Sequence, residues 1–283
     1  MIANYHTHTK RCGHAWGSER EYVEHAIEGG LKILGFSDHT PYPFPGNFKS
    51  GIRMEMEELE GYMDTVLSLK QEYRGEIEIH LGLEVEYYPA VFGKLLDAAK
   101  DYPIEYFLLA QHFLDNEYDT GIYSGTPTDS EAILAKYFDQ LTEAMETGAF
   151  TYLAHPDLIR FTGDSHIYEQ QARRFCRRAK ALGLPLEINF LGLMDHRHYP
   201  RDDFWLIAGQ EGCCAVFGAD AHAPQNVWDP ETLTVAEQLA GKYSLQVLDT
   251  VELVNPNGHL SPALSRRPSS SSLEILEPGL DFR

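Results

Sequence analysis

Seven short apolar or β-branched runs recur along the chain, and the segments between them have helical periodicity. The runs span residues 2–6, 31–39, 77–87, 106–113, 150–156, 184–190 and 214–222. The amphipathic segments include residues 18–30, 54–75, 129–148 and 166–183, and several have Ser or Asp near the start and Gly at the end, which suits helix caps. This alternation predicts an α/β fold with a parallel sheet and crossover helices.

Side chains that can bind metals stand at the C-terminal ends of these runs. They are His6, His8, His39, Glu84, His112, His155, Asp220 and His222. In a closed barrel all of these ends meet at one mouth, whereas an open sheet would spread them along an edge. The pattern therefore favours a TIM-like barrel, and an irregular one, because seven strands are visible where the regular form has eight.

Composition narrows the class of protein. The chain has 283 residues and a formal net charge of −20, which argues against binding a nucleic-acid backbone. Divalent ions bound together would still make one pocket locally positive, so small anionic substrates remain possible. Four scattered cysteines, no apolar run near the roughly 20 residues that span a bilayer, and no leader-like start predict a cytoplasmic protein without a membrane partner.

The chain divides into one large domain and a tail. Residues 1–255 show no internal repeat and no linker, and we expect them to form the barrel. Within the tail, residues 256–283, the stretch "SPALSRRPSSSSLEILEPGLDFR" (261–283) has a Ser run and three prolines. This composition predicts a tail that is extended or partly disordered.

The N-terminal histidines have two interpretations. His6 and His8 lie two residues apart on a predicted strand, so both imidazoles point to the same side and can reach one ion, yet an isolated pair of this kind is as often structural. His14, in a loop, is by itself typical of an exposed histidine. The repetition on strand after strand, with Glu84 and Asp220 added, favours a metal site, because so many buried polar groups need partners.

In this order the motifs "HTH", His14, "SDH", "GLE", His112, "HPD" and "DAH" resemble the polymerase-and-histidinol-phosphatase (PHP) family, and within it the histidinol-phosphate phosphatases. The resemblance runs from about residue 4 to about residue 255. It implies a distorted (β/α)7 barrel with two to three divalent metal ions, zinc, manganese or iron, at the C-terminal mouth. Asn4 and Ala219 depart from the family pattern, which often has Asp and Ser there.

The resemblance also implies how the ligands are shared. One metal would take His6, His8, Glu84 and Asp220, a second would share Glu84 and add His112 and His155, and a third would take His14, His39 and His222. A carboxylate such as Glu84 can bridge two ions while neutral imidazoles fill terminal positions.

The implied reaction is hydrolysis of L-histidinol phosphate, a small phosphorylated amino alcohol, by attack of a metal-bridging hydroxide. Glu84, Asp220 and His222 are the candidate catalytic residues, Arg160 and Arg197 the candidates for binding phosphate, and Asp115 or Glu117 the candidates for binding the amine. Two alternatives stay open: a phosphoesterase acting on nucleotides, nucleic-acid ends or another small monoester, and a metal-binding protein without catalysis. The sequence leaves the oligomeric state open.

Overall fold

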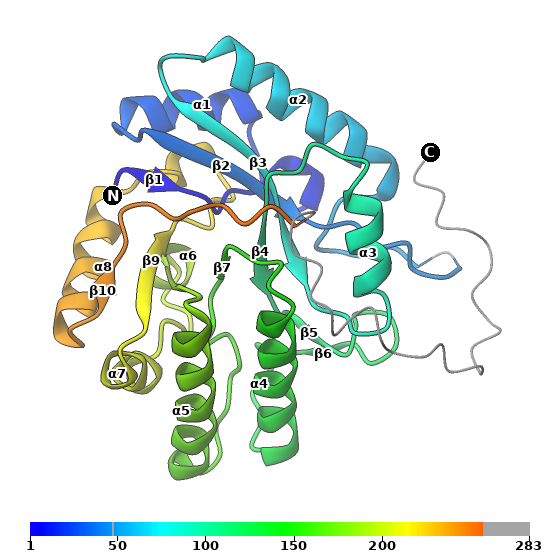
Figure 1. The fold of residues 1–283 in the computed structure, drawn as a ribbon. Coiled ribbons are helices and arrows are strands. Elements are labelled where there is room, and N and C mark those ends of the chain that lie inside the picture. The colour runs from blue at the N-terminus through cyan, green and yellow to red at the C-terminus, as the bar shows by residue number, and fades with distance from the viewer. Residues whose placement is uncertain (47, 257–283) are drawn as a thin grey trace.

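The computed structural model describes residues 1–46 and 48–256 (Figure 1). In this part of the chain, eight parallel strands form one curled sheet in the order β1-β2-β3-β4-β7-β8-β9-β10. The strands are β1 (Ala3–Asn4), β2 (Ile33–His39), β3 (Glu78–Glu86), β4 (Tyr106–Ala110), β7 (Tyr152–Leu153), β8 (Leu186–Asn189), β9 (Cys214–Gly218) and β10 (Gln246–Val247). Each predicted run contains one of the first seven, so the TIM-like fold is confirmed, with β10 as an eighth strand.

Helices cover the outer face of the sheet (Figure 1). They are α1 (Glu19–Glu28), α2 (Leu59–Glu72), α3 (Phe92–Ala99), α4 (Glu131–Glu146), α5 (Ser165–Leu182), α6 (Phe190–Met194), α7 (Asp202–Glu211) and α8 (Pro230–Lys242). The predicted caps are present in α1, where Ser18 accepts a hydrogen bond from the backbone of Glu21 and forms a capping box, and in α5, which ends at Gly183 in the left-handed conformation. A short hairpin, β5 (Phe113–Leu114) with β6 (Ile122–Tyr123), lies after β4.

Tyr106 fills the inside of the curled sheet. Its hydroxyl lies 2.7 Å from the backbone oxygen of Tyr5 and 3.1 Å from that of Phe36, so its one proton is within reach of both acceptors. A Cβ added at Gly82 would lie 2.4 Å from the Tyr106 ring, and one at Gly35 would lie 2.2 Å from its hydroxyl. Glycine at these two strand positions therefore makes room for the ring that packs the barrel centre.

The segment after β10 closes the amino-terminal end of the barrel. Leu248, Val251 and Leu253 pack against a small interior cluster that includes Tyr106, and the backbone NH of Val254 donates to Oγ1 of Thr151 at 3.0 Å. In Figure 1 this segment crosses from β10 toward β3 and β4. The functional end of the barrel is thus the opposite one, where the strands terminate.

The predicted tail, residues 256–283, lies outside the described residues except for Pro256. Each helix in the described part of the chain is too short or too polar to cross a membrane.

Candidate metal centre

Strand register brings the candidate ligands to one mouth. His39 at the end of β2 lies opposite Glu84 in β3. Beyond β1 and β9 the chain continues side by side, with a bridge between Thr7 and Ala221 and a 3.0 Å hydrogen bond from the NH of His8 to the carbonyl of Ala221. The histidines after β1 therefore face the acid and histidine after β9.

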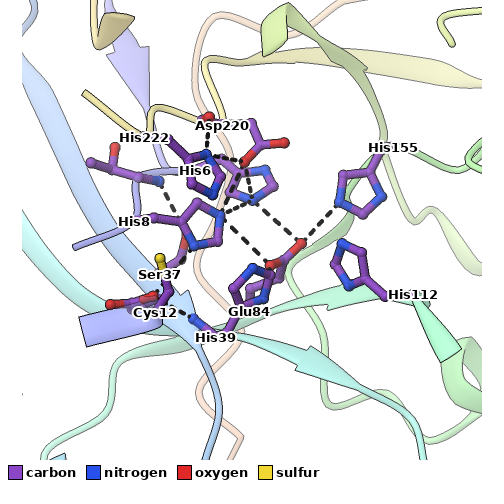
Figure 2. A network of polar contacts seen from close by, with 12 residues as sticks. His6, His8, Cys12, Ser37, His39, Glu84, His112, His155, Asp220 and His222 are labelled. Atoms are coloured by element: carbon purple, nitrogen blue, oxygen red, sulfur yellow. Dashed lines mark hydrogen bonds and ion pairs between the residues drawn. The ribbon is translucent and has the colours of Figure 1, made fainter. Parts of the chain in front are cut away.

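Two histidines and an aspartate meet at one side of the centre (Figure 2). Nε2 of His6 lies 3.1 Å from Nε2 of His8, and Nε2 of His8 lies 3.0 Å from Oδ1 of Asp220. All three side chains are buried. Only one proton can lie between the two facing ring nitrogens, whereas a cation would accept both lone pairs, so the pair fits a metal ion.

Glu84 lies between several histidines. Its Oε2 is 2.7 Å from Nδ1 of His39, and its Oε1 is 2.9 Å from Nε2 of His155 and 3.4 Å from Nε2 of His6. The carboxylate is 1% exposed, so bulk water does not compete with these contacts. One acid thus contacts ligand candidates from β2, from the loop after β1 and from the loop after β7.

The remaining candidates complete the arrangement. Nε2 of His14 lies 3.0 Å from Nε2 of His222, so the loop histidine does reach the mouth. Five groups have ligand atoms within 4.8 Å of one another: His14, His39 and His222; His6, His8 and Glu84; His6, His155 and Asp220; His39, Glu84 and His112; His8, Cys12 and His222. The structure brings together all nine ligands that the sequence predicted, and this mixture of imidazole and carboxylate suits divalent ions.

The electrostatics of the histidines differ across the centre. Burial, together with the neighbouring His8 and His14, lowers the pKa of His222 to about 3, and burial lowers the pKa of His39 well below its ordinary value. Both imidazoles are therefore neutral, the form that binds metals. Burial also acts to lower the pKa of His8, but hydrogen bonds to Asp220 and Asp38 raise it to about 9. Metal binding at His8 must therefore displace a proton.

Three acids that were not predicted from the sequence contact the second ring nitrogen, Nδ1, of candidate ligand histidines. Oε1 of Glu187 lies 2.8 Å from Nδ1 of His6, and Oε1 of Glu86 lies 2.8 Å from Nδ1 of His112. Asp38 lies 3.4 Å from Nδ1 of His8. Such contacts fix the tautomer and the orientation of a ligating imidazole. The available signal was strand alternation, since Glu86 follows Glu84 by two residues and therefore shares its face.

Two small features support these contacts. A Cβ at Gly218 would lie 1.8 Å from Oε1 of Glu187, so glycine there lets the acid reach His6. Oδ1 of Asn4, one of the departures from the family pattern, accepts the backbone NH of His6 at 3.1 Å and that of Ala219 at 3.0 Å. Asn4 thus joins β1 to the residue after β9 without contacting a ligand side chain.

A cavity of about 630 Å³ opens above the centre. Its lining includes five of the nine candidate ligands, His14, His39, His112, Asp220 and His222, together with Trp16, Phe113, Tyr123, Asp195, Arg197 and Tyr199. Nη2 of Arg197 lies 2.7 Å from Oδ2 of Asp195, and its Nη1 donates to the hydroxyl of Tyr199 at 3.0 Å. The structure therefore places one of the two predicted phosphate-binding arginines at the mouth.

The other predicted substrate residues lie apart from this lining. The side chain of Arg160 is exposed, Asp115 pairs with Lys136, and Glu117 is 3.0 Å from Nε of Arg53. Among the described residues that line the cavity, the acids are Asp195 and Asp220. Asp195 was not predicted, and nothing but its neighbour Arg197 marked it in the sequence.

The fold and this centre define a class of barrel enzymes with a multi-ligand metal mouth. The chain belongs to the PHP domain family, whose model matches residues 4–190.

Two curated relatives are similar over most of their length. One, from Deinococcus radiodurans, is named probable histidinol-phosphatase; it is 28% identical over 233 residues, which are 80% of this chain and 88% of that protein. The histidinol-phosphatase of Bacillus subtilis is 26% identical over 257 residues, covering 78% of this chain and 94% of that one.

The fold also matches a solved structure, the histidinol phosphate phosphatase of Lactococcus lactis complexed with zinc, L-histidinol and phosphate. The TM-score is 0.70 at 19% identity, with 90% of this chain and 98% of that chain covered. This match supports the barrel architecture.

Proposed function

We propose that this protein is a metal-dependent phosphomonoesterase that hydrolyses L-histidinol phosphate to L-histidinol and phosphate. The observation that carries the proposal is the convergence of nine candidate ligands at one mouth, below a cavity that Arg197 also lines. The names of the curated relatives, and the ligands of the Lactococcus lactis structure, support this choice of substrate.

The candidate ligands would hold two to three divalent ions, with zinc as the first choice because zinc is present in the Lactococcus lactis structure and manganese or iron as alternatives. When bound, such ions lower the pKa of water and neutralise phosphoryl oxygens. Glu84 would share its two oxygens between ions. Asp220 and His222 both line the cavity and remain, with Glu84, the candidate catalytic residues.

Arg197 would bind the phosphate, because its planar guanidinium matches phosphate oxygens in a bidentate way. The ion pair with Asp195 would hold this guanidinium at the mouth in the absence of substrate. Arg160 and Asp115 remain predictions for phosphate and amine binding. The aromatic side chains of Phe113 and Tyr123 offer apolar surface to the organic part of the substrate.

The proposed setting is the cytoplasm, where the four cysteines, all of them unpaired, would stay reduced. The net charge of −20 favours a small phosphorylated substrate over nucleic acid.

A substrate panel tests the proposal. Purified protein with its metal content measured is assayed for phosphate release from histidinol phosphate, from a nucleoside monophosphate and from a phosphodiester. We expect kcat/KM to be highest for histidinol phosphate and to vanish after chelation. Equal or higher turnover of the nucleotide or the diester would overturn the assignment of substrate, and full activity in the chelated protein would overturn the metal centre.

A further inference from the structure

Arg53 is a buried guanidinium that none of the functional arguments above uses. It lies in the loop after β2 and is 4% exposed. Its Nε donates to Oε2 of Glu117 at 3.0 Å, its Nη1 to the carbonyl of Thr40 at 3.1 Å, and its Nη2 to the hydroxyl of Tyr88 at 3.2 Å. Nη2 also lies 3.5 Å from Oε2 of Glu86. The fork thus joins strand β3 to the loop after β2 and to the turn between β5 and β6.

Glu86 connects this guanidinium to the candidate metal centre. Its Oε2 faces Arg53 and accepts a hydrogen bond from Tyr88, while its Oε1 accepts from Nδ1 of His112 at 2.8 Å and from the backbone NH of His112 at 3.2 Å. The two oxygens therefore have separate tasks. One is held by the guanidinium and a phenol, and the other fixes the ring of a candidate ligand.

This division matters because the bond at Nδ1 leaves Nε2 of His112 as the nitrogen with a free lone pair. His112 belongs to the group with His39 and Glu84, whose ligand atoms lie within 4.8 Å of one another. If Glu86 rotates, the ring of His112 loses the partner that sets both its tautomer and its direction.

We propose that Arg53, which contacts no candidate ligand, is a positioning residue for His112: through Glu86 it sets the metal affinity of the His39, Glu84 and His112 group. The chain from β2 onward thereby contributes to the centre twice, with His39 at the end of the strand and with Arg53 in the loop that follows it. This inference rests on the proposed metal centre and is independent of the proposed substrate.

The other side chains around Arg53 hold its guanidinium in a fixed position. The guanidinium carbon of Arg53 lies 5.4 Å from the ring centre of Tyr42 and 5.9 Å from that of Phe44, and the hydroxyl of Ser50 lies 2.9 Å from each oxygen of Glu117. A guanidinium enclosed by two carboxylates and two rings has one available position. Lysine cannot reproduce it, because an ammonium lacks the planar fork.

The test measures zinc binding by the full-length protein. Zinc-loaded wild type and Arg53→Met are titrated with a chromophoric chelator, and the absorption spectrum of cobalt-substituted samples reports the ligand geometry. We expect one metal equivalent of Arg53→Met to bind about 10- to 100-fold more weakly, the usual effect of losing an outer partner of a ligand, with an altered cobalt spectrum. Arg53→Lys should recover only part of the affinity.

A double-mutant cycle tests whether Arg53 acts on His112 through Glu86. Glu86→Gln should weaken the same equivalent, and adding Arg53→Met to it should have little further effect, because both changes release the same ring. Glu117→Gln keeps a hydrogen-bond acceptor for Arg53 and should leave the affinity within about threefold of wild type. The matched control is Arg173→Met, which removes a guanidinium paired with Glu169 and Glu211 on the outer surface and should not affect zinc binding.

Each outcome decides the question. Unchanged zinc affinity in Arg53→Met, or additive losses in the cycle, would overturn the proposal, as would a loss in Glu117→Gln equal to that in Arg53→Met. If Arg53→Met does not fold, Arg53→Lys and Glu86→Gln decide by the same measurements. If the wild type itself binds no zinc, the proposed metal centre fails instead, whereas a zinc-loaded wild type that does not hydrolyse histidinol phosphate refutes only the substrate.

Discussion

Oε1 of Glu84 lies 2.9 Å from Nε2 of His155, a residue 71 positions further along the chain. The other oxygen of the same carboxylate lies 2.7 Å from Nδ1 of His39. Because both oxygens face histidines from different segments, the negative charge of Glu84 acts on more than one of the ligand groups at once. Removing that charge should therefore have a larger effect than removing any single imidazole.

The first prediction follows from this arrangement. Glu84→Gln keeps the size and shape of the side chain but removes the charge, so we expect the folded protein to lose bound metal and nearly all phosphatase activity. Metal analysis and circular dichroism on the same sample separate metal loss from unfolding. The controls are His25→Ala and His166→Ala, which lie on exposed faces of α1 and α5 and should keep full metal content. A Glu84→Gln protein with full metal content would contradict the proposed sharing.

The inner part of the centre could be predicted from the sequence for a physical reason. A histidine or acid at the end of an apolar strand is chemically unusual, and parallel strands in a barrel end at the same mouth, so residue type and position together indicate the ligands. The outer acids were not visible in this way. Glu187 and Asp38 each act through one ring nitrogen, and only the packing of neighbouring strands, with Gly218 leaving space, shows which ring each acid contacts.

The same limit applies to the fold. Helix α7 buries Phe204, Trp205, Ile207 and Ala208, while Leu206 is exposed, so its sequence lacks the clear polar face that indicates a surface helix. Strand β10 has two residues, too few for an alternating pattern. The segment after it packs across the amino-terminal end of the barrel through long-range contacts that local sequence does not determine.

The second prediction concerns Arg197. Arg197→Met should keep the metal content, since the guanidinium is not a ligand, while kcat/KM for histidinol phosphate falls about tenfold or more, which corresponds to the loss of a charge-assisted hydrogen bond of roughly 1.5–3 kcal/mol. Arg197→Lys should recover part of the activity. The sequence predicts a similar loss for Arg160→Met, but Arg160 lies outside the cavity lining, so the structure favours a smaller one. Unchanged kcat/KM in Arg197→Met would mean that Arg197 does not bind the phosphate.

The third prediction separates Cys12 from the ligand set. The thiol lies in one group with His8 and His222, yet burial raises its pKa well above the ordinary value, and the histidines and carboxylates already supply the ligands of the other groups. We expect Cys12→Ser to keep metal stoichiometry and turnover. Cys214→Ser, a change at the far end of β9, is the control. Loss of one metal equivalent in Cys12→Ser alone would make Cys12 a ligand.

The last prediction concerns the stability of the barrel in acid. Glu105 accepts hydrogen bonds from Lys70 at 2.7 Å, from His80 at 3.1 Å and from the backbone NH of Leu81 at 2.8 Å. Burial acts to raise the pKa of Glu105, but these partners, His80 first, lower it to about 2. The folded state therefore favours the ionised form more than the unfolded state does.

The sign of the pH dependence follows. A carboxyl whose pKa is depressed on folding contributes stability above its unfolded pKa, about 4.5, and loses that contribution as the pH falls toward 2. The side chain is 30% exposed, so solvent screening reduces the contribution to about 1–2 kcal/mol.

Glu105→Gln should lower the free energy of unfolding by this amount at pH 7, measured by denaturant titration. The difference from wild type should shrink below pH 4.5, whereas Glu76→Gln, at an exposed position, should show no difference at any pH. A difference for Glu105→Gln that stays constant from pH 7 to pH 3 would mean that shape, and not charge, accounts for the loss.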